Sequence, residues 1–228
     1  MAMTKIGMVV AMRKEVLPFL EESGAKWTTE QVGNYTITYF CLKNKEVYLI
    51  ESGIGEIYAA GATQLLISRY GVDAVINFGV SGSLIEEVGV LNTVLVEGIV
   101  HYDFDLSPID NVSVGQYPGF ADVVIPCDKY LLGLAKELRP NTQSVICASA
   151  DKFVADEGKK ETLHTAYGAS ICEMECAGVA LTAINNGIPF LIIKAISDGK
   201  GGAEDYKAMV QKACQSYISF VYEILDRI

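Results

Sequence analysis

The chain has 228 residues, of which half are apolar and 20% are charged, and its formal net charge is −10. This composition is typical of a globular protein with a large core and excludes a disordered chain. The negative charge argues against nucleic acid or an anionic membrane as the partner, because both require basic patches.

Apolar residues recur along the chain in two patterns, short continuous runs and segments with helical spacing. The continuous runs predict strands at residues 5–12, 35–42, 46–53, 72–82, 90–100, 144–154 and 189–198. The helically spaced segments predict helices at residues 13–24, 54–71, 130–138, 176–187 and 206–228, with Pro18 in the first turn of the first helix. This alternation predicts an α/β fold, a three-layer α/β/α sandwich with a central mixed β-sheet. No linker or repeat interrupts the pattern, so residues 1–228 are expected to form a single domain.

The N-terminal segment and the cysteines bear on where the protein works. Residues 1–12 hold one lysine and a short apolar run, which fits a first buried strand better than a signal peptide. No apolar run reaches the roughly 18 residues that span a bilayer. The six cysteines form no zinc-binding pattern and are expected to be reduced, buried thiols. These features predict a cytoplasmic protein without a cofactor.

His101, Asp103 and Asp105 lie at alternating positions in the stretch HYDFDLS. In a strand, this spacing would place three metal-binding side chains on one face, but no further histidine lies nearby. A hydrogen-bonded loop explains the same residues as well, and we predict no metal site.

Polar or glycine-rich clusters follow five of the predicted strands. They read AMRKE, ESGIG, NFGVSGS, ASADKF and AISDG, and they begin at residues 11, 51, 77, 148 and 195. Glycine after a strand is usually only a turn. In open α/β sheets, however, ligands bind beyond the carboxyl ends of the strands. Five such clusters on one chain therefore favour a binding pocket at this edge of the sheet.

Two carboxylates in these clusters are candidates for acid–base chemistry, and each has a structural alternative. Asp198 directly follows an apolar strand, where burial would raise its pKa and keep it protonated as a general acid. The alternative is that Asp198 caps the following helix. Glu15 follows the first strand, either as a base that activates water or as an acidic residue in the first turn of a helix.

The stretch CEMECAG at residues 172–178 places two more carboxylates before an apolar helix. Glu173 and Glu175 would stabilise the helix start through the helix dipole. In an extended segment they would instead share a face and bind the adjacent hydroxyls of a ribose. Met174 would then offer a flexible apolar surface to the sugar. Phe153 is the candidate to stack on a planar ring.

Taken together, these stretches resemble the purine nucleoside phosphorylase superfamily, and within it the bacterial 5′-methylthioadenosine/S-adenosylhomocysteine nucleosidases. The resemblance runs nearly from end to end, and its most specific motifs are EMECAGVA and, about twenty residues later, AISD. It implies a nucleoside phosphorylase-like fold and hydrolysis of the N-glycosidic bond of a purine nucleoside. The implied substrates are 5′-methylthioadenosine and S-adenosylhomocysteine, which would yield adenine and a free 5′-substituted ribose, as in methionine salvage.

The resemblance also implies which residues carry the chemistry. Asp198 would protonate the leaving purine at N7, with Ser197 as its hydrogen-bond partner. Glu15 would activate the attacking water. Glu175 would bind the 2′- and 3′-hydroxyls of the ribose, with Met174 against the sugar.

The purine base is implied to bind at the DKFV stretch. Phe153 would stack on the base, and the backbone of Val154 would read its edge. The other residues expected to bind substrate are Met12, Ile54, Val80, Ser81 and Glu173.

Four residues at three sites depart from the pattern of that family. The loop GVSGS has Val80 in place of a hydroxyl-bearing residue, and Cys176 and Ala177 replace a small pair such as Gly-Ala. Lys194 replaces the commoner arginine before AISD, which is expected to be a change tolerated at the surface. These departures bear on the substrate more than on the fold.

Other functions fit the same fold. A phosphorylase needs arginines to bind phosphate, and the loop after the strand at 72–82 has none, so hydrolysis is favoured over phosphorolysis. A catalytically silent nucleoside-binding protein needs no proton donor, whereas Glu15, Glu175 and Asp198 occur here together. A domain whose carboxylates are all helix caps is the remaining alternative.

The resemblance implies a small-molecule purine nucleoside as the partner and a homodimer as the quaternary structure. In the family, the partner subunit closes the 5′ end of the pocket with the segment near GQYPGF. Phe104, Tyr117 and Pro118 are accordingly expected to line that end. An apolar lining there would favour methylthio or homocysteinyl groups over a hydroxyl.

Overall fold

The computed structural model describes residues 3–199 and 202–228. The strands are β1 (Lys5–Val10), β2 (Trp27–Val32), β3 (Tyr35–Leu42), β4 (Lys45–Glu51), β5 (Ala74–Ser83), β6 (Thr93–His101), β7 (Ile125–Pro126), β8 (Ser144–Ser149), β9 (Ile171–Glu173) and β10 (Phe190–Asp198). The helices are α1 (Arg13–Ser23), α2 (Glu56–Leu65) with a π-helical end η1 (Leu66–Tyr70), α3 (Lys129–Leu138), α4 (Glu157–Tyr167), α5 (Cys176–Asn185), α6 (Ala203–Ser216) and α7 (Ile218–Arg227).

The strands form one mixed sheet, as the sequence predicts. The strands β4, β1, β5 and β10 run parallel to one another, and β2 and β3 extend the β4 edge in antiparallel pairs. Because β10 pairs with β6 as well as with β5, the path β5–β10–β6–β8–β9 returns to β5 and closes a ring. The short strand β9 completes this ring beside the end of β5.

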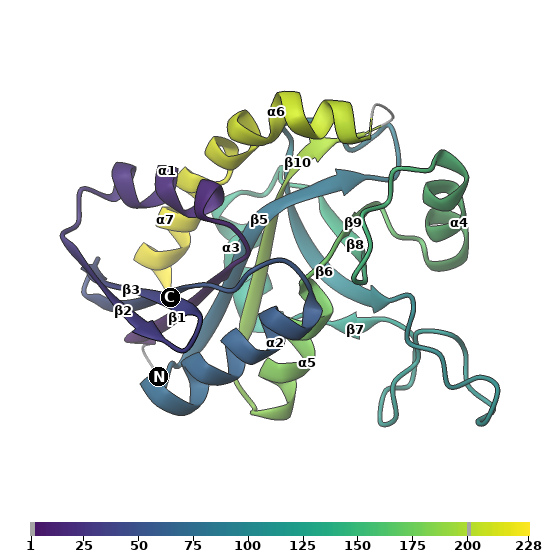
Figure 1. Cartoon of the computed structure of the whole chain (residues 1–228), viewed down its shortest axis with the longest axis horizontal. Coiled ribbons are helices and arrows are strands. Elements are labelled where there is room, and N and C mark those ends of the chain that lie inside the picture. The colour runs from purple at the N-terminus through teal and green to yellow at the C-terminus, as the bar shows by residue number, and fades with distance from the viewer. Residues whose placement is uncertain (1–2, 200–201) are drawn as a thin grey trace.

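Helices cover both faces of the sheet, which confirms the three-layer architecture (Figure 1). Along β1, Met8 and Val10 face a core cluster shared with α1, α3, α6 and α7. Val9 points to the opposite cluster, which is shared with α2 and α5. Strands buried on both faces are continuously apolar, and this is why they were recognisable in the sequence.

Several elements differ from the prediction. The strands β2, β7 and β9 and the helix α4 were not predicted, because β2 is largely exposed, the other two strands have at most three residues and α4 is polar. The predicted C-terminal helix is two helices that meet at Tyr217, whose buried hydroxyl donates to the carbonyl of Glu15 at 3.1 Å. Pro18 lies inside α1 rather than in its first turn, where it removes one helical N–H donor.

Among the residues that the structure describes, no helix combines the length and the apolar character that a membrane crossing requires.

Candidate functional site

A cavity of about 370 Å³ lies where the ends of several strands meet. Its lining comprises Met12, Glu15, Ile54, Val80, Ser81, Gly82, Lys152, Phe153, Val154, Cys172, Glu173, Met174, Glu175, Ser197, Asp198 and Tyr206. Every residue expected to act on or bind the substrate from within one chain is in this set. Four lining residues were not predicted, Gly82, Lys152, Cys172 and Tyr206.

The topology explains why residues so far apart in the sequence converge. The parallel strands β1, β4, β5 and β10 end at one edge of the sheet, and the backbone N–H groups of Ser52 and Gly53 bond to the end of β1. The end of β8 pairs with β9, which lies against the end of β5. All five polar clusters recognised in the sequence therefore contribute to the cavity.

Glu15 is buried in the first turn of α1 and is held by two backbone donors. Its carboxylate accepts hydrogen bonds from the N–H groups of Met12 and Val80, each at 2.9 Å. Burial raises the pKa of Glu15 more than these bonds and the nearby Lys194 lower it. A Cβ atom at Gly79 would lie 2.8 Å from Oε1 of Glu15, so β5 needs glycine at this position.

Asp198 is the last residue of β10 and also borders the cavity. The hydroxyl of Ser197 donates to its Oδ1 at 2.7 Å, yet burial dominates and raises the pKa of Asp198. Gly82 leaves room for the carboxyl group, since a Cβ atom there would lie 2.8 Å from Oδ2. The alternative role as a helix cap is wrong, because the N-cap of α6 is Gly202.

Glu173 is held by the start of α5 and is not free to bind hydroxyls. Its carboxylate accepts from the N–H groups of Glu175 and Cys176 at 3.0 Å and from the hydroxyl of Ser149 at 2.6 Å. It also forms a buried ion pair with Lys194 at 3.0 Å. Burial alone would raise the pKa of Glu173, but Lys194 and these donors outweigh it and lower the pKa.

Glu175 differs from Glu173 although only one residue separates them. The predicted extended segment ends at Glu173, and Glu175 is the N-cap of α5, so the two side chains do not share a strand face. The carboxylate of Glu175 borders the cavity and accepts the N–H of Gly55 at 3.0 Å. Burial and the negative charge of Glu173 raise the pKa of Glu175 to about 8. Met174 lines the cavity between them.

Lys194 is not a surface residue, which corrects the expectation from the sequence. Its side chain is 2% exposed and contacts the carboxylate of Glu173 beneath the cavity. Cys147, Cys176 and Glu173 bring three potential metal ligands within 4.8 Å of one another. The ammonium group of Lys194 already supplies a positive charge to Glu173, so we assign no metal to this cluster.

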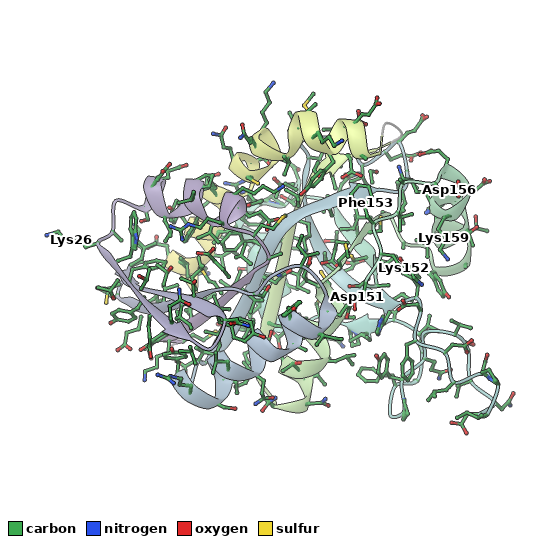
Figure 2. The ribbon with its side chains drawn as sticks, in the orientation of Figure 1. Lys26, Asp151, Lys152, Phe153, Asp156 and Lys159 are labelled. Atoms are coloured by element: carbon green, nitrogen blue, oxygen red, sulfur yellow. The ribbon has the colours of Figure 1, made fainter. Side chains whose placement is uncertain are left out.

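The other side of the cavity is made by an exposed segment between β8 and α4. Figure 2 shows Asp151, Lys152 and Phe153 on this segment, and Asp151 accepts the N–H of Glu56 at the start of α2 at 2.7 Å. The ring of Phe153 is 49% exposed and meets Tyr206 edge-on at 5.8 Å. A planar ligand therefore has access to the face of Phe153.

The three residues expected at the 5′ end lie outside the cavity lining. Phe104 and Tyr117 stack on each other at 3.8 Å, in the long segment between β6 and β7 that also carries Pro118. The hydroxyl of Tyr117 hydrogen-bonds Nδ1 of His101 at 2.7 Å, and Nε2 of His101 contacts Asp103 at 3.0 Å. The hydrogen-bonded loop, rather than a strand of metal ligands, is thus the structure of this stretch.

Comparison with known proteins gives results that agree with one another. A profile of the phosphorylase superfamily matches residues 5–228. The aminodeoxyfutalosine nucleosidase of Helicobacter pylori is 31% identical over 98% of this chain and 99% of its own length. The 5′-methylthioadenosine/S-adenosylhomocysteine nucleosidase of Bacillus cereus is 28% identical over 98% of this chain and 99% of its own.

A solved structure is equally similar over the whole chain. The 5′-methylthioadenosine/S-adenosylhomocysteine nucleosidase of Helicobacter pylori has a TM-score of 0.94 and 28% identity over 100% of both chains. That protein is in complex with a compound that joins an aminopyrrolopyrimidine to a pyrrolidinol bearing a propynylthiomethyl group.

Proposed function

The chain belongs to the phosphorylase superfamily and is a purine nucleosidase, and we propose that its substrates are 5′-methylthioadenosine and S-adenosylhomocysteine. The observation that carries the proposal is that three buried carboxyl groups of raised pKa, Glu15, Glu175 and Asp198, border one cavity beside an exposed aromatic ring. Perturbed carboxyl groups gathered in a cleft are typical of acid–base sites.

In the proposed reaction Asp198 supplies a proton to the leaving base. Burial raises the pKa of this carboxyl group and so favours its protonated form, and Ser197 orients it. As the bond between C1′ and N9 breaks, the proton moves to N7, and the base departs as neutral adenine. Phe153 stacks on the base, and the Val154 backbone contacts its edge.

The remaining steps of the proposed reaction are the attack of water on C1′ and the binding of the ribose. Glu15 takes a proton from water whose oxygen attacks C1′, so that one water is consumed and a free ribose is formed. Glu175 accepts hydrogen bonds from the ribose hydroxyls, and its ionised form is favoured as positive charge develops on the sugar. Glu173 does not bind hydroxyls in this proposal but holds the turn that carries Met174 and Glu175.

Two observations favour water over phosphate as the nucleophile. The lining residues in the described part of the chain include no arginine, and the one lysine among them, Lys152, contacts Asp103 at 3.3 Å. Arg13, the arginine nearest in sequence to Glu15, forms an ion pair with Glu51 at 2.5 Å. A phosphate would also meet the carboxyl group of Glu15.

Aminodeoxyfutalosine is the second candidate substrate, favoured by the relative of that name at 31% identity. Methylthioadenosine, S-adenosylhomocysteine and aminodeoxyfutalosine differ in the group attached to C5′, whereas the residues proposed for the chemistry are common to all three.

We propose that the protein is a homodimer and that Phe104, Tyr117 and Pro118 of one protomer line the 5′ end of its partner's cavity. The apolar stack of Phe104 on Tyr117 suits an alkylthio group.

The test is product analysis with purified protein. Methylthioadenosine, S-adenosylhomocysteine, aminodeoxyfutalosine, adenosine and inosine are each incubated with and without phosphate, and kcat/KM is compared. Release of adenine and free sugar from the two thio nucleosides, independent of phosphate, is expected. If kcat/KM is at least tenfold higher for aminodeoxyfutalosine than for the two thio nucleosides, aminodeoxyfutalosine is the substrate instead. A sugar 1-phosphate product would contradict the role of Glu15.

A further inference from the structure

Glu56, the first residue of α2, is a buried carboxyl group for which the proposed reaction has no use. It lies outside the cavity lining, and its Oε1 is 2.5 Å from the hydroxyl oxygen of Ser149. The same hydroxyl oxygen lies 2.6 Å from Oε1 of Glu173 and 3.1 Å from the N–H of Ala177. Ser149 therefore joins two carboxyl groups to the start of α5.

Counting protons at Ser149 shows that one of these carboxyl groups is protonated. The N–H of Ala177 can only donate, so it uses one lone pair of the serine oxygen. The serine has a single hydroxyl proton, which serves one of the two short contacts to carboxylate oxygens. The other short contact needs a proton on the carboxyl group, because two oxygens without a proton between them repel at this distance.

The proton belongs to Glu56 because of what surrounds each carboxyl group. Glu173 has the ammonium group of Lys194 at 3.0 Å and two backbone N–H donors, which all favour its anion. The charged side chains with the largest effect on Glu56 are the carboxyl groups of Glu173, Asp151 and Glu175, and each opposes its ionisation. Burial is the largest cause and, together with Glu173, raises the pKa of Glu56 to about 8.

The backbone at Glu56 connects three parts of the site. The N–H of Gly55 donates to Glu175 at 3.0 Å, and the N–H of Glu56 donates to Asp151 in the segment that carries Phe153. The carbonyl of Glu56 packs on α5 so closely that a Cβ atom at Gly178 would lie 2.4 Å from its oxygen. A displacement of Glu56 would thus reach the groups proposed for both ribose and base.

We propose that Glu56 is a positioning residue whose carboxylic acid donates a hydrogen bond to Ser149, and that this bond holds the Gly55–Glu56 backbone and the Glu175 carboxylate in place for the ribose. The proposal rests on the proposed function, because Glu175 is assigned to the ribose there. Loss of the proton would leave Glu56 and Glu173 as anions across one hydroxyl. Asp151 and Glu175 add negative charge nearby, and the phenols of Tyr102 and Tyr117 lie within electrostatic reach of Glu56. Ribose binding should therefore weaken as the pH rises.

The experiment compares the wild type with Glu56→Gln and Glu56→Met, with Glu161→Gln as a control at an exposed carboxylate on α4. Glutamine keeps a neutral donor to Ser149, whereas methionine keeps the volume without a donor. KM and kcat for methylthioadenosine are measured from pH 6 to pH 10, and Tm is measured from pH 5 to pH 9. Glu175 is present in every protein, so the ratio of variant to wild type isolates Glu56.

The ratio of kcat/KM for Glu56→Gln to that of the wild type should rise about tenfold for each pH unit above pH 8, as ionisation inactivates the wild type alone. Glu56→Met should lack the alkaline loss as well, but its KM should be about tenfold higher at every pH, since the hydrogen bond is missing. The control should follow the wild type. The positioning role would be overturned if Glu56→Met had the same KM as Glu56→Gln. It would also be overturned if the ratio of kcat/KM for Glu56→Gln to that of the wild type stayed constant with pH.

The Tm measurement is independent of activity. A raised pKa means that the acid form of Glu56 contributes stability below its ordinary pKa and that this stability is lost as the pH rises to about 8. The Tm of Glu56→Gln should therefore exceed that of the wild type by an amount that grows from pH 5 to pH 8. If no nucleoside is cleaved, the proposed function fails while this difference persists. A pH-independent difference in Tm overturns the protonated state of Glu56.

Discussion

The cavity has two sides that the chain builds in different ways. The floor consists of Glu15, Glu173, Glu175 and Asp198, which are all buried at strand ends or helix starts and hydrogen-bonded to the backbone or to a neighbouring side chain. The rim is represented by Ile54 and Phe153, which are 52% and 49% exposed and lie in loops. The carboxyl groups proposed to transfer protons or to hold their neighbours in place are buried, while groups that must admit a ligand remain accessible.

The two sides of the cavity therefore have different roles, proton transfer at the floor and ligand contact at the rim. On the floor, burial and neighbouring charges together set the protonation state of each carboxyl group, and fixed hydrogen-bond donors restrict it to one position. On the rim, contacts are few and a ligand can displace side chains at little cost. Substitutions on the floor should therefore change kcat or stability, whereas substitutions on the rim should change KM and substrate preference.

The largest effect should come from Asp198→Asn, which removes the proposed proton donor while keeping its shape. We expect kcat to fall by about 10²- to 10⁴-fold with KM little changed, because the lost group acts in the transition state. The raised pKa of Asp198 means that its contribution to stability is lost as the pH rises, so the variant should be more stable than the wild type at neutral pH. Adenine release and thermal unfolding measure the two effects.

The control for that substitution is Asp226→Asn, at an exposed carboxylate 3.6 Å from Lys43. It should leave kcat unchanged. A variant of Asp198 that retains more than about a tenth of the wild-type kcat would mean that the base leaves without this acid.

The next largest effect concerns the buried ion pair between Lys194 and Glu173, which supports the floor of the cavity. Lys194→Met removes the cation from the buried pair with Glu173 and leaves an uncompensated carboxylate at the start of α5. Breaking a buried ion pair in this way should lower the free energy of unfolding by about 3–5 kcal/mol. Lys136→Met removes a lysine at the same 3.0 Å distance from Glu97 but at the surface, and it should cost about 1 kcal/mol or less. Urea unfolding of both variants makes the comparison, and equal losses would refute the distinction.

Floor and rim also differ in how well the sequence predicted them. Strand ends follow from apolar runs, so Glu15 and Asp198 were assigned to the pocket from local pattern, and the cavity lining includes both. The distinct surroundings of Glu173 and Glu175 were not predictable, since they depend on where β9 ends and α5 begins.

Contacts between distant residues were missed altogether. Glu56 and Ser149 are 93 positions apart, and no local pattern indicates that both approach Glu173. For the same reason Lys194 was assigned to the surface, because a lysine is normally exposed and its buried partner cannot be read from the strand that carries it. The closure of the sheet into a ring, which brings these residues together, was likewise not predicted.

On the rim, Phe153→Ala should raise KM by about tenfold and change kcat little. Loss of one aromatic stacking partner costs roughly 0.5–1.5 kcal/mol beyond the area that it buries. Because Phe153 contacts Tyr206 only edge-on and is half exposed, unfolding should be almost unaffected. Tyr130→Ala, at an exposed ring on α3, serves as the control. A fall in kcat with unchanged KM would place Phe153 with the floor instead.

The smallest effect should come from Phe104→Ala, which tests whether a second copy of the chain extends the rim. Phe104 stacks on Tyr117 outside the cavity lining of its own chain, and in the proposed homodimer it would contact the substrate of the partner protomer. Removing part of an apolar contact should raise KM for methylthioadenosine about threefold, by well under the 1.5–3 kcal/mol of a fully buried side chain. Adenosine, which lacks the alkylthio group, should show no such rise. Ile109→Ala, an exposed residue of the same segment, controls for loop damage. An equal rise in KM for both nucleosides would mean that Phe104 supports the loop rather than contacting the 5′ group. A protein that stays monomeric at assay concentration would contradict the proposed contact between Phe104 and the partner's substrate.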